Sequence, residues 1–126
     1  MSYLLDTHVL LWWVADDPTL RADTRTTITN PDHDVAVSAA SIWEAAIKRA
    51  LGKLRFETSV LLDTLSRGGI RVVAVTAEHA LAAGDLPRHH DDPFDRMLVA
   101  QAVAEGLILI SRDARLRAYQ VALVEA

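Results

Sequence analysis

The chain of 126 residues contains no cysteine. This absence excludes disulfide bonds, zinc sites built from thiolates, iron–sulfur clusters and a thiol nucleophile. No apolar run reaches the roughly 18 residues that a membrane-spanning helix requires. The amino terminus also lacks a basic leader followed by an apolar stretch of signal length. We therefore expect a cytoplasmic protein without a membrane anchor.

Excess positive charge is also missing, because 13 Lys and Arg stand against 17 Asp and Glu, for a net charge of −4. A protein that coats nucleic acid by bulk charge is basic, so this balance argues against that class. It leaves open an enzyme that meets nucleic acid through metal ions. Hydrophobic residues make up 51% of the chain, which argues against disorder. At this length we expect residues 1–126 to form a single domain.

Short apolar runs alternate with helical stretches along the whole chain. The expected strands are residues 3–5, 34–37, 70–75, 107–110 and 121–124. Helical patterns fill the intervals, and this alternation is typical of a parallel sheet with helices on its faces. We predict an α/β fold of three layers, α/β/α, around a central and mostly parallel sheet of four to five strands.

Two acidic residues follow closely on expected strands. Asp6 comes directly after residues 3–5, and Asp113 comes after residues 107–110 with a spacer of two residues. In open parallel sheets, functional sites form outside the carboxyl ends of the strands. Each residue also has a purely structural explanation. Asp6 could cap the following helix, and Asp113 could be an acid in a first helical turn, where the helix dipole favours it.

Asp95 belongs to a helix that we expect over residues 93–105. Asp92 is a typical N-cap and Pro93 a typical first helical residue. A helical wheel then places Asp95 in the middle of the apolar face. A carboxylate that faces a core costs several kcal/mol unless a partner compensates for it. That partner could be the backbone N–H of Asp92, or it could be a metal ion.

Glu44 belongs to a helix that we expect over residues 41–54. The predicted apolar stripe of this helix consists of Trp43, Ile47, Ala50, Leu51 and Leu54. Glu44 falls at the edge of this stripe, with Lys48 four residues on as a partner for a surface salt bridge. Such a pair contributes only a few tenths of a kcal/mol, which is too little to require this placement.

The four acidic residues together suggest one pocket at the carboxyl edge of the sheet. Carboxylates that lie close together repel one another, and their pKa values rise unless cations neutralise them. A cluster of oxygen ligands without cysteine is the ligand set that Mg²⁺ or Mn²⁺ prefers. Such ions activate water and stabilise the transition state of phosphoryl transfer.

Several short segments resemble, in the same order, those of the PIN-domain family, and more narrowly its bacterial VapC-type toxins. These segments are residues 4–8, 38–44, 47–48, 52–54, 92–96, 100–102 and 109–113, so the resemblance covers nearly the whole chain. Two departures stand out. Ser111 occupies a position where the family often has threonine, and Asp92 adds an acid close to Asp95.

The resemblance implies a PIN-like α/β/α fold and an endoribonuclease that depends on Mg²⁺ or Mn²⁺. It makes a metal-binding and catalytic quartet of Asp6, Glu44, Asp95 and Asp113. It further implies a toxin that cuts a few defined RNA molecules, a cognate VapB-like antitoxin that blocks the site, and commonly a homodimer. Asp92 would act as an N-cap or as an outer group of the site.

Three other functions deserve comparison. A phosphatase with an aspartyl nucleophile needs a second acid two residues after the first, and His8 stands there instead. A phospho-acceptor module needs an aspartate at the end of a central strand, but the strands at 34–37 and 70–75 are followed by Ser38 and Thr76. A PIN-like binding or scaffold protein without activity is the third alternative, and the presence of all four acids argues against it.

A few further side chains have both a functional and a structural interpretation. The hydroxyls of Thr7 and Ser111 could orient a carboxylate or cap a helix. Arginines near the acids could contact RNA phosphates or form a solvated face; these are Arg96, Arg112, Arg115 and Arg117. For His89 and His90 we expect a solvated loop, because adjacent histidines rarely bind one ion together. Packing in a core or an interface is expected for Trp12, Trp13 and Trp43, rather than stacking on bases.

Overall fold

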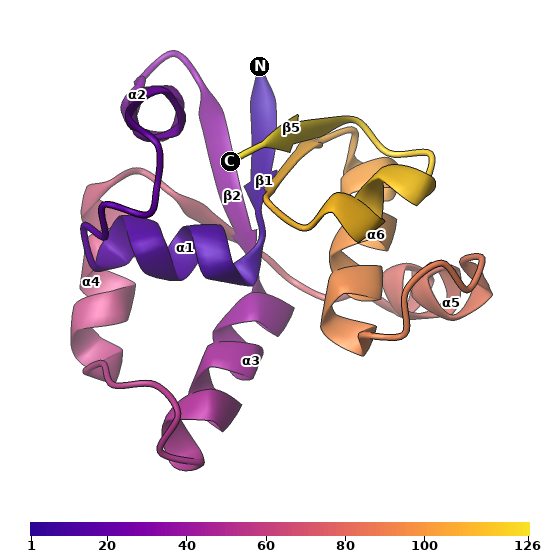
Figure 1. Ribbon diagram of the computed structural model, residues 1–126, viewed down its shortest axis with the longest axis horizontal. Helices are drawn as coiled ribbons and strands as arrows, with labels where there is room; N and C mark the ends of the chain where they lie inside the picture. The colour runs from indigo at the N-terminus through magenta and orange to yellow at the C-terminus, as the bar shows by residue number, and fades with distance from the viewer.

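The computed structural model describes residues 1–126 and contains one sheet of five strands (Figure 1). The strands are β1 (Ser2–Leu5), β2 (Asp34–Ser38), β3 (Arg71–Val73), β4 (Ile108–Ser111) and β5 (Leu123–Glu125). Their order across the sheet is β3-β2-β1-β4-β5, and all neighbouring pairs are parallel. The predicted parallel sheet is therefore confirmed, with five strands.

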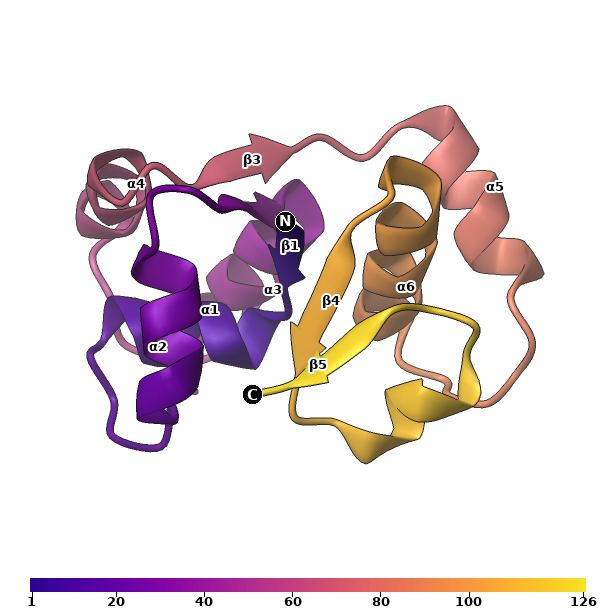
Figure 2. The same cartoon turned by 90° about the horizontal axis from the view of Figure 1, so that it is seen from above.

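Helices flank the sheet on both sides (Figure 2). One side carries α1 (Thr7–Val14), α2 (Ala22–Thr29) and α4 (Thr58–Arg67), and the other carries α5 (Ala77–Asp85) and α6 (Pro93–Glu105). The helix α3 (Ala39–Ala50) follows β2 and contacts both α1 and α6, and a short 3₁₀ helix, η1 (Ala114–Ala118), follows β4. The structure thus has the predicted three layers.

Each face of the sheet has its own hydrophobic core. In β1, Tyr3 and Leu5 point into a cluster with Val9 and Leu10 of α1, whereas Leu4 points to the opposite side and packs with Leu98 of α6. Alternate residues of a strand face opposite sides of the sheet. Because helices cover both sides of the central strands, β1 and β4 carry buried apolar residues on both faces, as is typical of parallel sheets.

Both ends of α6 are capped, and the N-terminal cap fixes the position of Asp95. The carboxylate of Asp92 accepts hydrogen bonds from the backbone N–H groups of Phe94 and Asp95, and Pro93 is the first helical residue. At the other end, Gly106 takes a left-handed conformation with φ of 66°, which closes the helix. The predicted cap and first residue are confirmed, and Asp95 is the third residue of the helix.

Several predicted boundaries differ from the structure. The helix expected over residues 41–54 starts two residues earlier, because the side chain of Ser38 caps it by accepting from the N–H of Ala40. It ends at Ala50, before Gly52, whose φ of 74° is incompatible with a continuing helix. The strand expected over residues 70–75 is only three residues long. None of the helices combines the length and the apolar character that crossing a membrane requires.

Candidate active site

Strands and helices deliver the four predicted acids to one region of the fold. Asp6 follows β1 directly, and Asp113 lies two residues beyond β4. Since β1 and β4 are parallel neighbours, their carboxyl ends lie at the same edge of the sheet. The helix α3 starts directly after β2 and carries Glu44, and α6 presents Asp95 from its first turn.

Asp6 is a buried carboxylate held by two donors. As the N-cap of α1 it accepts a hydrogen bond of 2.8 Å from the N–H of Val9, which confirms the predicted capping role. Its other oxygen accepts from the hydroxyl of Ser111 on β4. Burial raises the pKa of Asp6, these hydrogen bonds lower it, and the charge of Asp113 raises it further. A cation near Asp6 would offset this desolvation.

The environment of Asp95 also disfavours its ionised form. Burial raises its pKa to about 6, and the charges of Asp92 and Asp6 raise it as well, whereas the neighbouring His90 lowers it. One oxygen of Asp95 lies 2.8 Å from Nε2 of His90. A hydrogen bond from the backbone N–H of Asp92 was one predicted compensation, and the structure has the His90 contact in its place.

Asp113 lies at the start of η1 and is partly exposed. Its backbone N–H donates to the hydroxyl of Ser111 at 3.1 Å, so one hydroxyl group contacts both Asp6 and Asp113. The guanidinium of Arg115 donates to both oxygens of Asp113, at 3.0 and 2.8 Å, and these hydrogen bonds lower the pKa of Asp113. Asp113 is the N-cap of η1, one position before the predicted first turn.

Glu44 lies on the buried side of α3. Its Oε1 accepts a hydrogen bond of 2.6 Å from the hydroxyl of Thr7, the residue after Asp6, and its Oε2 lies 3.3 Å from Nζ of Lys48. Thr7 therefore links Glu44 to the start of α1. The hydroxyls of Thr7 and Ser111 both contact carboxylates in the structure, which matches the orienting role considered for them.

The predicted apolar stripe of α3 was wrong. Trp43 is 64% exposed, and Leu51 is exposed to the same extent. The buried side chains of this helix are Ala40, Ser41, Glu44 and Ala45. Small side chains let α3 lie close to α1 and α6, and a tryptophan on that face would hold the helices apart. Of the core or interface packing expected for Trp43, the core alternative is therefore wrong, whereas Trp12 and Trp13 are partly buried against the core as expected.

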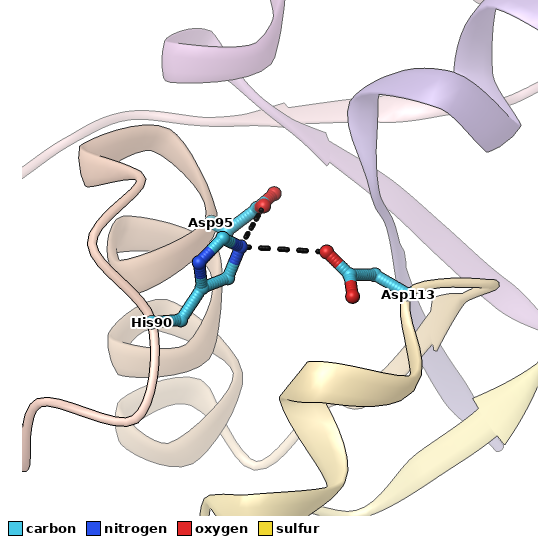
Figure 3. Close-up of side chains that lie close together, drawn as sticks. All are labelled: His90, Asp95 and Asp113. Atoms are coloured by element: carbon cyan, nitrogen blue, oxygen red, sulfur yellow. Dashed lines mark hydrogen bonds and ion pairs between the residues drawn. The ribbon is translucent and has the colours of Figure 1, made fainter.

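His90 was predicted to lie in a solvated loop, and this prediction was wrong. The residue is only 7% exposed, and its imidazole lies between Asp95 and Asp113 (Figure 3). Nε2 of His90 is 2.8 Å from Asp95 and 3.4 Å from Asp113. One ligand atom from each of these three residues lies within 4.8 Å of the other two, which is close enough for a shared metal ion. His89, in contrast, is exposed as predicted.

The four arginines near the acids have partners within the chain. Arg96 donates to backbone carbonyls in the last turn of α5 and in the loop that follows it. Arg112 lies 4.6 Å above the ring of Trp12 and donates to two backbone carbonyls. Arg115 binds Asp113, and Arg117 pairs with a glutamate of β5. The RNA contacts considered for Arg96 and Arg112 stay predictions, and both side chains have a structural role.

Removal of the Ser111 hydroxyl should destabilise this corner of the site. Ser111→Ala deprives the buried Asp6 carboxylate of a donor and the N–H of Asp113 of its acceptor. Losing a partner of a buried polar group costs about 1–3 kcal/mol, so we expect a clear loss of thermal stability at pH 7. Ser111→Thr keeps the hydroxyl and should melt close to the wild type. Equal melting temperatures for Ser111→Ala and the wild type would show that the two hydrogen bonds of this hydroxyl do not contribute to stability.

Comparison with known proteins identifies the family of this chain. The PIN domain model matches residues 3–122. A curated relative, Ribonuclease VapC22 of Mycobacterium tuberculosis, is 33% identical over 122 residues, which are 94% of this chain and 92% of that protein.

Solved structures agree on the fold. VapBC2 from Rickettsia felis, bound to a DNA fragment of its promoter, matches with a TM-score of 0.76 and 17% identity over 99% of this chain and 98% of that chain. VapBC-1 from nontypeable Haemophilus influenzae matches with a TM-score of 0.66 and 20% identity over the same shares. The family model and the relative of 33% identity together show that the chain belongs to the PIN-domain family.

Proposed function

We propose that this chain is a metal-dependent endoribonuclease, the toxin of a toxin–antitoxin pair, which cleaves specific RNA molecules in the cytoplasm. Residues 1–126 would act as one PIN domain. The observation that carries the proposal is the meeting of Asp6, Asp95 and Asp113 where the strands end. Burial raises the pKa values of Asp6 and Asp95, and a neighbouring carboxylate adds to each, Asp113 for Asp6 and Asp6 for Asp95. The relative of 33% identity, which is a ribonuclease by name, supports the choice of RNA.

The donor set fits Mg²⁺ or Mn²⁺. Carboxylate oxygens are the ligands that these ions prefer, and two of the carboxylates have raised pKa values that a cation would lower. The residues that would hold the ion are Asp6, Glu44, Asp95 and Asp113. When bound, such an ion lowers the pKa of a water molecule and stabilises negative charge on the phosphate.

The remaining residues of the site keep these carboxylates in place. Ser111 and the N–H of Val9 hold Asp6, and Thr7 holds Glu44. Asp92 caps α6 and thereby fixes the turn that carries Asp95. At the rim, the exposed guanidinium of Arg115 donates to both oxygens of Asp113 and holds that carboxylate.

Incubation of the purified, antitoxin-free protein with total cellular RNA tests the proposed activity. We expect discrete fragments with Mg²⁺ or Mn²⁺ and none with EDTA. Sequencing of the fragment ends would give the cleavage site, and the family resemblance implies 5′-phosphate and 3′-hydroxyl products. Intact RNA after incubation with folded, metal-loaded protein would favour the inactive scaffold considered above.

We infer that the partner of this toxin is a VapB-like antitoxin. The support is that solved structures with the same fold are VapBC and toxin–antitoxin complexes. A small protein encoded next to this chain should bind it on co-expression and should suppress the RNA cleavage. If no neighbouring product binds or inhibits the protein, the toxin part of the proposal fails while the nuclease part can still hold.

We further propose a homodimer that forms through an exposed apolar surface. A hollow of about 630 Å³ is lined by Ala39, Ala40, Trp43, Val75, Pro93, Phe94 and Met97. The rings of Trp43 and Phe94 meet edge to face, with centroids 5.5 Å apart. Exposed apolar patches of this kind mark interaction sites.

Trp43→Glu should convert this dimer to a monomer, because it places a charge in the middle of the apolar surface. The molar mass in solution, measured by light scattering after size exclusion, checks the outcome. Leu81→Glu, at an exposed leucine of α5 outside this surface, is the matched control and should stay dimeric. A monomeric wild type would contradict the proposed dimer.

A further inference from the structure

The placement of His90 between two carboxylates suggests a role that sequence patterns did not indicate. His90 comes from the connection between α5 and α6, Asp95 from α6 itself, and Asp113 from the loop after β4 (Figure 3). Two carboxylates, one from α6 and one from the loop after β4, therefore meet at one imidazole. The side chain is 6% exposed, so the packing around it leaves little freedom to turn away.

The backbone of His90 is anchored from two directions. Its carbonyl oxygen accepts hydrogen bonds of 3.3 Å from the hydroxyl of Tyr119 and from Nη1 of Arg96. Arg96 also donates to the carbonyls of Leu86 and Pro87, both at 3.0 Å. Because Arg96 directly follows Asp95 on α6, the helix that carries the carboxylate also holds the loop that carries the imidazole.

The contact between His90 and Asp95 determines which of the two side chains donates the hydrogen bond. An ionised carboxylate can only accept hydrogen bonds, so Nε2 of His90 has to be the donor to Asp95 at 2.8 Å. The same N–H points toward Asp113 at 3.4 Å. One donor therefore lies between two carboxylates that would otherwise repel each other. It contacts only one oxygen of Asp95, so the second oxygen of Asp95 stays available to a cation.

We propose that His90 is a positioning residue of the metal centre, which holds the Asp95 and Asp113 carboxylates in the arrangement that receives the ion. This inference rests on the proposed function of the same site. Residues that hydrogen-bond metal ligands typically change metal affinity by 10–100-fold when they are lost. The nitrogen itself acts through the carboxylates, since its N–H is engaged with them.

Metal binding, measured without any substrate, tests the role of His90. The probes are Mn²⁺, followed by the loss of its free-ion paramagnetic resonance signal, and Mg²⁺ in competition with it. The variants are His90→Gln, whose amide nitrogen can take the place of Nε2, and His90→Asn, whose shorter side chain cannot reach Asp95. His89→Asn, at the exposed neighbouring histidine, is the control. Melting curves in EDTA verify that each variant is folded.

We expect His90→Asn to bind both ions about 10–100-fold more weakly than the wild type, by the same factor for Mn²⁺ and Mg²⁺. His90→Gln should retain most of the affinity, and His89→Asn should retain all of it. Unchanged or tighter binding by His90→Asn would overturn the positioning role.

A second outcome would also overturn it. If His90→Gln binds as weakly as His90→Asn, and the loss is much larger for Mn²⁺ than for Mg²⁺, the imidazole is a direct ligand, because nitrogen ligands favour Mn²⁺ over Mg²⁺. A wild type that binds neither ion would overturn the proposed metal-dependent function itself, and the positioning role with it. The wild-type measurement therefore separates the two failures.

Discussion

Asp95→Asn should lower metal-dependent RNA cleavage by about 10³-fold or more, because the several kcal/mol of transition-state stabilisation that a metal supplies correspond to a factor of this size. The amide is close to the carboxylate in shape and can still accept the hydrogen bond from His90. The charge that attracts the ion is nevertheless gone. Initial rates on total RNA, or on a fragment identified from it, check this result.

The same substitution should stabilise the metal-free protein near neutral pH. Burial raises the pKa of Asp95 from 3.8 to about 6, so the folded state holds a proton that the unfolded state has lost between these two values. The free energy of unfolding of the wild type therefore falls as the pH rises through this window. Above pH 6 the cost is fully present, and it amounts to at most about 3 kcal/mol.

Denaturant unfolding of both proteins in EDTA measures this difference. We expect Asp95→Asn to be more stable than the wild type at pH 7 and equally stable near pH 4. Asp91→Asn, at an exposed acid of the same segment, is the matched control and should follow the wild type at both pH values. If Asp95→Asn unfolds more easily than the wild type at pH 7, or still cleaves RNA at the wild-type rate, Asp95 does not have the proposed role in the site.

Arg96→Ala should lower the free energy of unfolding by about 3 kcal/mol, because hydrogen bonds from a charged donor contribute about 1.5–3 kcal/mol each and several are lost together. The guanidinium donates to the carbonyls of Ala83 and Leu86 at 2.9 and 3.0 Å, and to that of Pro87. Without it, the end of α5 and the loop before α6 lose their main anchor. For a chain of this length, we expect the melting temperature to fall by about 10 °C.

Arg96→Lys separates geometry from charge. Lysine keeps the positive charge but lacks the planar fork that reaches several carbonyls at once, so we expect it to recover only part of the stability. Arg88→Ala, at an exposed arginine of the same loop, is the control and should melt like the wild type. If Arg96→Ala melts like the wild type but binds RNA more weakly, Arg96 is an RNA contact as first predicted and the loop is held by other means.

Much of the fold could be predicted because local patterns and tertiary packing agree. The central strands are short apolar runs because helices cover both of their faces, and the alternation of strands and helices favours parallel pairing. The positions of Asp6 and Asp113 also follow from this logic, because a residue directly beyond a parallel strand necessarily lies at the carboxyl edge. Asp92 and Pro93 are typical start signals of a helix, and they placed Asp95 correctly.

The failed predictions share a physical reason: the burial of a side chain depends on which other elements pack against its helix or loop, and local sequence patterns do not contain that information. A helical wheel assigns the largest apolar side chains to the core, but α3 packs through Ala40, Ser41 and Ala45, so Trp43 points outward. Glu44 can be buried because Thr7 and Lys48 compensate for it, and both contacts exist only in the folded chain. The single useful signal for Glu44 was its i,i+4 spacing from Lys48.

His90 was misjudged for a related reason. The rule that adjacent histidines rarely bind one ion together says nothing about one of them turning inward while the other stays exposed. Arg96 and Tyr119 hold the carbonyl oxygen of His90, and its imidazole lies against Asp95 and Asp113; no local pattern reveals these contacts. The spacing of five residues between His90 and Asp95, across the start of a helix, was the feature that could have suggested it.

Cleavage of one defined RNA as a function of metal concentration tests the central claim most directly. The substrate is a fragment that contains a cleavage site mapped on total RNA, and the proteins are the wild type and Asp6→Asn. We expect no cleavage by the wild type in EDTA, a rate that rises with Mn²⁺ and saturates, and no cleavage by Asp6→Asn at metal concentrations that saturate the wild type. Cleavage by the wild type in EDTA, or full activity of Asp6→Asn, would contradict a metal-dependent nuclease built on these carboxylates.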